Sequence, residues 1–442
     1  MVVLRSLLGV LWMFGLVDQA SAQTAAEGHA WLAAEVERFN RAVSSGAPRP
    51  LSAHLVDDVL HLDLLTSRTF RNYCAGTLDD YEDVIPDEEL HQLLADCRSG
   101  VLSAFRDRLL RDLSAELGQG LGELGVRDSD FDVSRGRLTL ASVLGQGPEI
   151  VLHARRSSGR WGVEDVSLNS TRISETYRAR HSKAIEREMS FEVLRSELEG
   201  RDYVVVDDFS NSSPGELPKG WRWRKRDEKK DKPYEVQVQG NHHVLAARDT
   251  GKSVILLKSS HWDPHEFPIM TWCWRADTLP PGGDERFGHT NDSAAGLYII
   301  FSQNWLGLPR QIKYVWSTTL PEGTMERRKK WARPYFFVEE SGYEHRGEWR
   351  FEMVDLIENY QRAYNGRPKN RTLGIGVLTD ANSTDSSAEA SYADIRVWPR
   401  RALQEKRIVD HCQCLNAAKN GQSKDAGTVS GSDTSGPLRT VR

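Results

Sequence analysis

The sequence predicts an α+β protein in which a helix-on-sheet domain is followed by an antiparallel, jelly-roll-like β-sandwich. Up to about residue 198 the apolar residues recur mostly at helical spacing. From residue 203 to 398 they instead form many short runs that are typical of strands. The 442 residues are enough for two or three domains, each with a core of its own.

The composition excludes several classes of protein. With 39% hydrophobic and 27% charged residues the chain is neither collagen-like nor disordered throughout. The 58 basic residues are outnumbered by 63 acidic ones, which gives a net charge of −5. Because no bulk positive field is available to hold a phosphate backbone, nucleic acid is excluded as a partner.

Residues 1–22 have the pattern of a signal peptide. Arg5 supplies a positive charge, an apolar run follows from Leu7 to Val17, and Ala20-Ser21-Ala22 provides the small residues of a cleavage site. A membrane anchor would need about 20 apolar residues, and the run before Asp18 is too short. We therefore expect cleavage after Ala22 and a periplasmic mature protein.

The five cysteines of an exported chain permit at most two disulfides. Cys74 and Cys97 are candidates for one of them, although Cys97 could equally be an apolar filler on a helix. His411-Cys412-Gln413-Cys414 lacks the second pair of ligands that a structural zinc site needs. We expect neither a metal ion nor a cofactor.

The first domain is expected over residues 23–200. Pro86 and the acidic residues after it mark the start of a long helix. Strand-like runs follow at 137–143, 149–155 and 160–168, separated by glycine-containing turns that predict an antiparallel meander. A helical stretch over 174–198 closes the domain. The apolar stripe of the long helix contains Leu90, Leu94, Cys97, Val101, Phe105, Leu109, Leu113 and Leu117.

The strand-to-helix segment of this domain carries a family resemblance. Gly159-Arg160-Trp161-Gly162-Val163-Glu164-Asp165-Val166, continuing to Tyr177-Arg178-Ala179-Arg180-His181, resembles the end of the MlaC-like toluene-tolerance family of periplasmic binding proteins. The similarity covers about residues 30–199. It departs at Ser170-Thr171-Arg172, where the family usually has Gly-Val-Ser.

The resemblance implies a fold of the nuclear-transport-factor type, with helices and a bent sheet around an apolar cavity. It also implies that the domain carries phospholipid beside an inner-membrane ABC transporter. An apolar helix stripe that faces a sheet is, however, also what an ordinary core requires. The residues that such a cavity would take are Leu94, Val101, Phe105, Leu109, Leu138, Leu140, Val163 and Val166.

The second domain, residues 201–399, is predicted to be a two-sheet sandwich with one helix at 353–364. Residues 400–442 are polar, and we expect a disordered tail there. The predicted strands cover residues 203–209, 234–239, 243–248, 253–258, 269–275, 296–301, 311–317, 335–338, 374–379 and 393–397.

This half resembles the domain of unknown function 3047 family, over about residues 203–399. It departs at Gly296, where the family often has Arg, and at Asp380-Ala381-Asn382, where the family tends to have a second Asp. The matching segments are Pro218-Lys219-Gly220-Trp221, Trp272-Cys273-Trp274-Arg275, Asn291-Asp292, Tyr298-Ile299-Ile300-Phe301, Tyr314-Val315-Trp316, Gly374 to Asp380 and Tyr392-Ala393-Asp394-Ile395.

Three groups of polar residues could suggest chemistry. The segment from Ala246 to Ser253 resembles a phosphate loop, but a strand-like run follows it where a helix would be required. His242-His243 would point to opposite faces of a strand. Asp207-Asp208 and Asp394 could meet as calcium ligands or be ordinary turn carboxylates. Because no catalytic motif is present, we do not expect an enzyme.

Most of the 13 tryptophans lie in the second half. Trp272 and Trp274 share one strand face and suit a packed core. Trp221-Arg222-Trp223-Arg224-Lys225-Arg226 combines indoles with positive charges, which fits either contact with an anionic membrane surface or a solvated loop.

The sequence thus predicts an exported protein that carries phospholipid or another apolar ligand as an auxiliary component of an ABC transport system. The alternative is binding of a glycan or another envelope polymer by the sandwich. A third hypothesis is hydrolysis or lysis of such a polymer by Asp and His residues of the sandwich, with Asp380 as the residue to test.

Overall fold

The computed structural model describes most of the chain between residues 26 and 419. The expected signal peptide, residues 1–22, lies outside the described part, as do residues 420–442. No helix within the described part is both long and apolar enough to cross a bilayer. The described ranges are 26–31, 33–34, 37, 41, 51–78, 87–117, 125–132, 137–143, 149–157, 160–224, 227, 232–303, 309–327 and 334–419.

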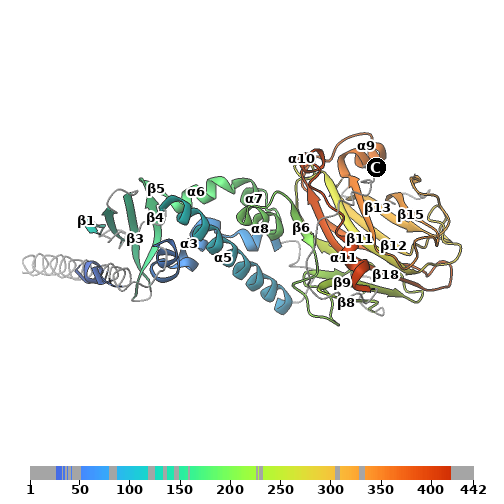
Figure 1. Ribbon diagram of the computed structural model, residues 1–442, viewed down its shortest axis with the longest axis horizontal. Helices are drawn as coiled ribbons and strands as arrows, with labels where there is room; N and C mark the ends of the chain where they lie inside the picture. The colour runs from blue at the N-terminus through green and yellow to red at the C-terminus, as the bar shows by residue number, and fades with distance from the viewer. Residues whose placement is uncertain are drawn as a thin grey trace, which may run out of the picture. The chain divides into compact units, whose positions relative to one another are not determined.

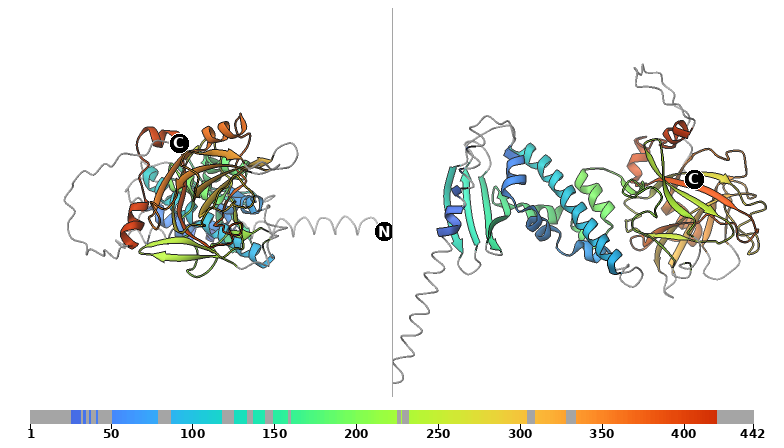
Figure 2. Two further views of the ribbon diagram at one scale, coloured as in Figure 1. Left: turned by 90° about the vertical axis from the view of Figure 1, so that its right-hand side faces the viewer. Right: turned by 90° about the horizontal axis from the view of Figure 1, so that it is seen from below.

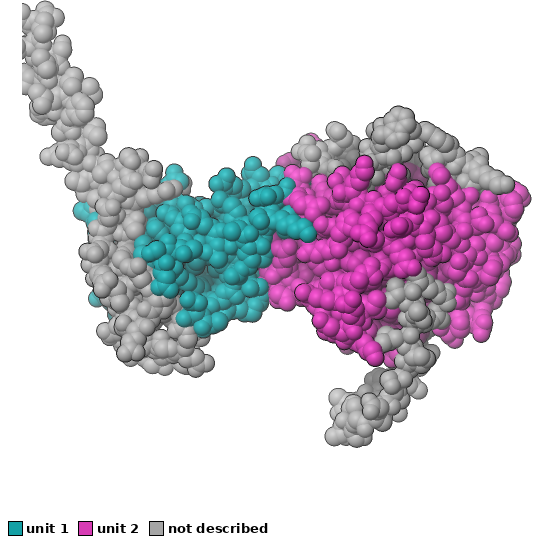
Figure 3. All heavy atoms as spheres, turned by 90° about the horizontal axis from the view of Figure 1, so that it is seen from above, with its two compact units in different colours: residues 1–76, 95–186 teal, residues 77–94, 187–442 magenta. Residues whose placement is uncertain are grey.

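The chain divides into two compact units, which Figure 3 colours separately. The first unit comprises Met1–Gly76 and Ala95–Glu186, and the second comprises Thr77–Leu94 and Arg187–Arg442. The division of the chain at residue 200 into two domains that fold independently remains a prediction.

The N-terminal half contains one long helix and several short ones. The long helix starts with Asp87, Glu88 and Glu89, whose negative charges favour a helix N-terminus. The expected helix at 174–198 is instead three helices, because residues 187–190 are not helical and Glu188 has a φ of +48°. The helices are α2 (Leu51–His54), the π-helix η1 (Leu55–Val59), α3 (Leu62–Phe70), α4 (Tyr73–Leu78), α5 (Asp87–Leu117), α6 (Ile173–Arg180), α7 (Ser182–Glu186) and α8 (Phe191–Glu199).

The sheet of the first unit is the predicted antiparallel meander, with its strands in sequence order (Figures 1 and 2). The first of them was not predicted because the sequence Gly-Val-Arg-Asp-Ser-Asp-Phe-Asp is mostly polar. The nuclear-transport-factor type of fold remains a prediction. The strands are β1 (Gly125–Asp132), β2 (Arg137–Val143), β3 (Glu149–Ser157), β4 (Arg160–Leu168) and β5 (Thr171–Arg172).

The second unit contains the β-sandwich. Its two sheets have the strand orders β14-β15-β13-β12-β17-β10-β7 and β16-β11-β18-β9-β8, and β6 also pairs with β18. The strands pair antiparallel except β13 and β15, which run parallel. The strands are β6 (Val204–Asp207), β7 (Trp221–Trp223), β8 (Tyr234–Gln239), β9 (His242–Asp249), β10 (Leu256–Ser259), β11 (Ile269–Thr278), β12 (Ala295–Gln303), β13 (Pro309–Ser317), β14 (Met325–Arg327), β15 (Tyr335–Ser341), β16 (Arg350–Asp355), β17 (Gly374–Val377) and β18 (Ala388–Trp398).

Aromatic side chains join the two sheets. The ring of Trp272 on β11 lies 5.3 Å from that of Tyr314 on β13, and the rings of Trp274 and Trp316 are 6.2 Å apart. All four side chains are fully buried. The interpretation of Trp272 and Trp274 as core residues is therefore correct.

The helix expected at 353–364 begins later than predicted. Residues up to Asp355 continue β16, and α9 spans Leu356–Tyr364. The Asp355 carboxylate caps α9 by accepting hydrogen bonds from the amides of Ile357 and Glu358. The apolar spacing alone could not reveal that this aspartate ends a strand and starts a helix.

Residues 400–419 differ from the expected disordered tail. They contain α10 (Arg400–Gln404) and α11 (Cys412–Lys419). Ala402, Ile408 and Leu415 are buried in this segment, so its few apolar side chains are used for packing. Composition could not predict these helices, because their few apolar residues are scattered among polar ones.

Two disulfides are present. Cys74 bonds to Cys97, so Cys97 forms a disulfide and is not a free apolar filler on the helix. Cys412 bonds to Cys273 on β11 and ties α11 to the sandwich. Cys414 is free and exposed.

A buried carboxyl group makes the stability of the sandwich depend on pH. Trp274 Nε1 donates to Glu352 Oε1 at 3.1 Å, and the side chain of Glu352 also hydrogen bonds to that of Glu340. Burial raises the pKa of Glu352 well above 4.5, and the charge of Glu340 adds to the rise. Folding therefore favours the protonated form of Glu352 over its ionised form.

Replacing this group by its neutral isostere, Glu352→Gln, should make the protein more stable at pH 8. In the native protein, protonated Glu352 makes its full contribution to the free energy of unfolding below pH 4.5. This contribution is lost as the pH rises toward the raised pKa, by about 1.4 kcal/mol for each unit by which the pKa is raised. Thermal melts at pH 5 and pH 8 measure this. The exposed Glu344→Gln variant is the control, and an equal pH response of Glu352→Gln and the native protein would contradict the prediction.

Candidate functional site

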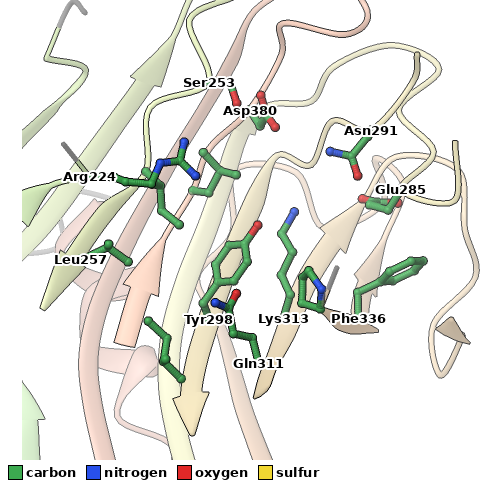
Figure 4. A pocket seen from close by; sticks show the side chains of 14 residues that line it. Arg224, Ser253, Leu257, Glu285, Asn291, Tyr298, Gln311, Lys313, Phe336 and Asp380 are labelled. Carbon is green, nitrogen blue, oxygen red and sulfur yellow. The ribbon is translucent and has the colours of Figure 1, made fainter. Parts of the chain in front are cut away.

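A groove of about 310 Å³ lies on the outer face of the seven-stranded sheet in the second unit, the face turned away from the other sheet. Its volume is at the lower end of the range for small-molecule sites. Tyr298 and Ile300 on β12 line it together with Gln311 and Lys313 on β13. Figure 4 shows Tyr298 and Lys313 side by side, with Ser253 and Asp380 above them and Asn291 and Glu285 to their right.

Strand alternation assigns the two faces of this sheet. On β12, Leu297, Ile299 and Phe301 are fully buried, whereas the residues between them line the groove. On β13, Ile312 and Tyr314 are likewise buried in the sandwich. Along each strand, side chains that line the groove thus alternate with side chains that pack in the core.

Glycines keep this face hollow. Gly374 and Gly376 on β17 pair with Ile300 and Tyr298 of β12, so the floor between β12 and β10 has no side chain at these positions. A Cβ atom on Gly376 would lie 2.7 Å from the side chain of Leu257. A side chain at this position would therefore fill part of the groove.

Gly296 makes room for the lysine of the groove. A Cβ atom at this position would lie 2.6 Å from Cε of Lys313, so only glycine lets the lysine take its present course. Lys313 is 4% exposed, and its Nζ lies 5.5 Å from the ring centroid of Tyr298, a cation–π distance. Position 296 thus has no side chain, and a lysine from the next strand lies above it.

Glu285 is held inside the groove by hydroxyl groups. Ser293 Oγ donates to its Oε1 at 2.9 Å and Ser317 Oγ donates to its Oε2 at 2.7 Å. Lys313 Nζ in turn donates to Ser293 Oγ at 2.9 Å. Burial raises the pKa of Glu285, and the positive charge of Lys313 opposes the rise.

Asp380 is the second acidic residue of the groove, and it is 2% exposed. Burial raises its pKa to about 6, with Asp292 and Asp249 adding to the rise and Lys313 opposing it. A carboxyl group with this pKa changes charge close to neutral pH. The groove is therefore lined by two cations, Lys313 and Arg224, and by two acids that burial drives toward the neutral form.

A further aspartate, Asp249, fixes loops around the groove. Asp249 accepts hydrogen bonds from the amides of Gly251, Lys252, Ser253 and Ala381. The amides of the segment that resembles a phosphate loop are thus directed at this carboxylate, and no helix follows them. The conclusion that residues 246–253 do not form a nucleotide site agrees with this geometry.

Two of the three aspartates considered as calcium ligands are engaged by cations of the chain itself. Asp207 Oδ2 lies 2.8 Å from Lys258 Nζ, and Asp394 Oδ1 lies 2.7 Å from Arg396 Nε. Among the residues that the structure describes, no group of three or more acidic, histidine or cysteine side chains could hold a metal ion. Cys412 of the His411 to Cys414 segment is in a disulfide.

The residues proposed for a lipid cavity are mostly buried in the first unit. Val101, Phe105 and Leu109 on α5 and Val163 and Val166 on β4 are 0–2% exposed. Leu94 is half-buried. Only the backbone of β2 is described, and its register places Leu138 beside Ala154 and Leu140 beside Leu152. Whether these eight residues contact an apolar ligand remains a prediction.

Phe105 lies in an aromatic cluster. Its ring makes edge contacts with Phe70 at 5.1 Å and Tyr177 at 5.0 Å between centroids. The hydroxyl of Tyr177 donates to Asp112 Oδ2 at 2.6 Å. Phe105 is thus held between other side chains of the unit, as expected for a core residue.

The motif that carries the MlaC-like resemblance has a structural role. Asp165 is fully buried, and its carboxylate accepts hydrogen bonds from Ser174 Oγ at 2.6 Å and from the amide of Val166 at 3.0 Å. Arg68 Nε on α3 lies 3.4 Å from the same carboxylate. One acidic side chain thus joins β4 to the start of α6 and to α3.

The sequence identified Asp380 as a candidate residue and missed the rest of the groove. The sequence does not predict Glu285, Lys313 or Gln311 as groove residues, and it contains Tyr298 only in a segment that carries the family resemblance. The available signal is the alternation Gln311-x-Lys313 in a strand whose residues Ile312, Tyr314, Val315 and Trp316 are apolar or aromatic. Two polar residues on one face of such a strand indicate that this face does not pack in a core.

Comparison with known proteins supports the resemblance of the second half. Residues 219–396 match the family described as protein of unknown function DUF3047. No curated protein sequence matches the chain.

Several solved structures are similar to parts of the chain at low identity. A phospholipid-binding protein from Ralstonia solanacearum is 15% identical, with 41% of this chain and 95% of that chain covered and a TM-score of 0.24. A carbohydrate-binding module specific for non-crystalline cellulose is 9% identical, with 42% and 91% covered and a TM-score of 0.25. The family 30 carbohydrate-binding module of a Clostridium thermocellum cellulase is 10% identical, with 45% and 97% covered and a TM-score of 0.25.

Proposed function

We propose that the protein is an exported binding protein whose second unit binds a glycan of the cell envelope in the groove on the seven-stranded sheet. Export is inferred from the signal-peptide pattern of residues 1–22. The proposal assigns no chemical step to the groove.

The lining of the groove is the observation that carries this proposal. Sugars present hydroxyl groups at their edges and C–H groups on their faces, so their sites combine hydrogen-bonding side chains with aromatic rings. Gln311, Asn291 and Lys313 supply polar groups here, and Tyr298 and Phe336 supply rings. A long acyl chain would instead require a predominantly apolar lining.

Retention of the mature protein, residues 23–442, on a glycan array tests the proposal. We expect binding to at least one envelope glycan and a loss of tenfold or more in Tyr298→Ala, because this variant removes a ring of the groove. Tyr343→Ala is the matched control, since Tyr343 is an exposed tyrosine that does not line the groove. Absence of binding by the native protein, or equal binding by Tyr298→Ala, would contradict the proposal.

A second candidate function belongs to the first unit, which we propose carries phospholipid or another apolar ligand for an inner-membrane ABC transporter. The MlaC-like resemblance of residues 159–181 supports it. Mass spectrometry of an organic extract of the purified mature protein is the test. We expect about one lipid per protein molecule, and an extract without lipid would argue for a filled core.

A further inference from the structure

Asp380 has an unused acceptor inside the groove. Within the described part of the chain its Oδ1 is buried and has no hydrogen-bond partner. Such atoms are uncommon in native proteins, because each one loses its hydrogen bond to water without replacement. A donor from outside the chain would remove this penalty.

The neighbouring buried carboxylates differ from Asp380 in this respect. Asp292 accepts hydrogen bonds from the amides of Ser383 and Thr384 and from the Thr384 hydroxyl. Asp249 similarly caps the amides of residues 251–253 and Ala381. These two aspartates organise loops, whereas Asp380 lines the groove that the loops surround.

Lys313 supplies the complementary groups. An ammonium has three N–H donors, and within the described part of the chain Lys313 Nζ donates to Ser293 Oγ. Figure 4 shows Lys313 extending from β13 toward the loops, with Asp380 above it. Its positive charge also acts on Asp380, where it opposes the rise of the pKa.

We propose that Asp380 and Lys313 together bind two adjacent hydroxyl groups of an uncharged sugar, a proposal that rests on glycan binding by the groove. A carboxylate only accepts hydrogen bonds and an ammonium only donates them, whereas a hydroxyl group does both. One hydroxyl donates to Asp380 Oδ1, and its neighbour accepts from Lys313 Nζ. A ligand amine would be repelled by Lys313 and Arg224, and a ligand carboxylate would be repelled by ionised Asp380.

The test uses the mature full-length chain and cello-, xylo-, manno- and chito-tetraose at pH 7.5. We expect the native protein to bind at least one tetraose, and both Asp380→Ala and Lys313→Met to lose at least tenfold in affinity. Lys313→Met keeps the aliphatic chain above Gly296 and removes the ammonium. Periodate, which cleaves the bond between adjacent hydroxyl-bearing carbons, should abolish binding of cello-, xylo- or manno-tetraose, whose units carry such a pair, and binding of chito-tetraose alone would contradict the proposal.

Thermal melts separate a binding role of Asp380 from a structural one. Asp380→Ala should melt close to the native protein, because among the described residues it removes one buried acceptor without a partner and otherwise only the hydrogen bond with Ser253. The matched Asp292→Ala variant should melt lower, because it leaves loop amides without their acceptor. An equal fall in both variants would overturn the proposal.

The binding data distinguish the remaining outcomes. If the native protein binds a tetraose and the Asp380 and Lys313 variants bind it equally well, glycan binding stands and the hydroxyl-pair assignment fails. If the native protein binds the periodate-treated sugar as strongly as the untreated sugar, the hydroxyl-pair assignment likewise fails and glycan binding stands. If the native protein binds none of the four tetraoses and no array glycan, both proposals fail.

Discussion

Loss of the Cys273–Cys412 disulfide is expected to destabilise the sandwich by about 3 to 5 kcal/mol, because this bond closes a long loop of the unfolded chain. For a unit of this size that corresponds to a fall in melting temperature of roughly 10 °C. The variant Cys412→Ala should be made in a Cys414→Ala background, so that Cys273 has no alternative partner on α11. Differential scanning calorimetry gives the measurement.

Cys414→Ala alone is the control, and it should melt like the native protein because Cys414 is exposed and free. Truncation offers a second comparison. A chain that ends at residue 419 keeps α11 and should retain its stability, whereas one that ends at residue 399 loses Cys412 and Leu415. Equal melting of these two chains would show that α11 contributes nothing to the sandwich.

Phe105→Glu is expected to unfold the first unit. The native ring is fully buried against Phe70 and Tyr177, so the variant removes these contacts and buries a charge without a partner. Together these changes cost at least about 4 kcal/mol, comparable to the whole stability of a small domain. Circular dichroism should show loss of helix at 25 °C.

Ser103→Glu provides the matched control, since Ser103 is an exposed residue of the same helix. It should fold like the native protein. A Phe105→Glu variant that keeps its helix content but loses co-purified lipid would show instead that Phe105 lines a cavity. The experiment thus decides between the core and cavity interpretations of Phe105.

The strands that could be predicted were those with a buried face and a clear turn on either side. The segments 137–143 and 234–239 were predicted with the bounds that the structure has, because apolar residues and turn signals agree there. The polar strand β1 has no such pattern. The start of α9 depends on one cap, Asp355, which no periodicity argument would single out.

The groove was harder to predict because its members are distant in sequence. Tyr298 and Lys313 become neighbours through the pairing of β12 with β13, and Ser317 reaches Glu285 across 32 positions. Local spacing contains no information about such contacts. Asp380 was found only because it lies at a departure from the pattern of a related family.

The close approach of Lys313 to Gly296 has a consequence for how this groove can evolve. Any side chain at 296 would collide with the lysine, so substitutions at the two positions should be correlated. In relatives with Arg at the equivalent of 296, the residue at the equivalent of 313 should be shorter, with the guanidinium occupying the same space. The positive charge would then stay at the same place in the groove, although a residue of the neighbouring strand would supply it. A covariation analysis of the family would detect this exchange.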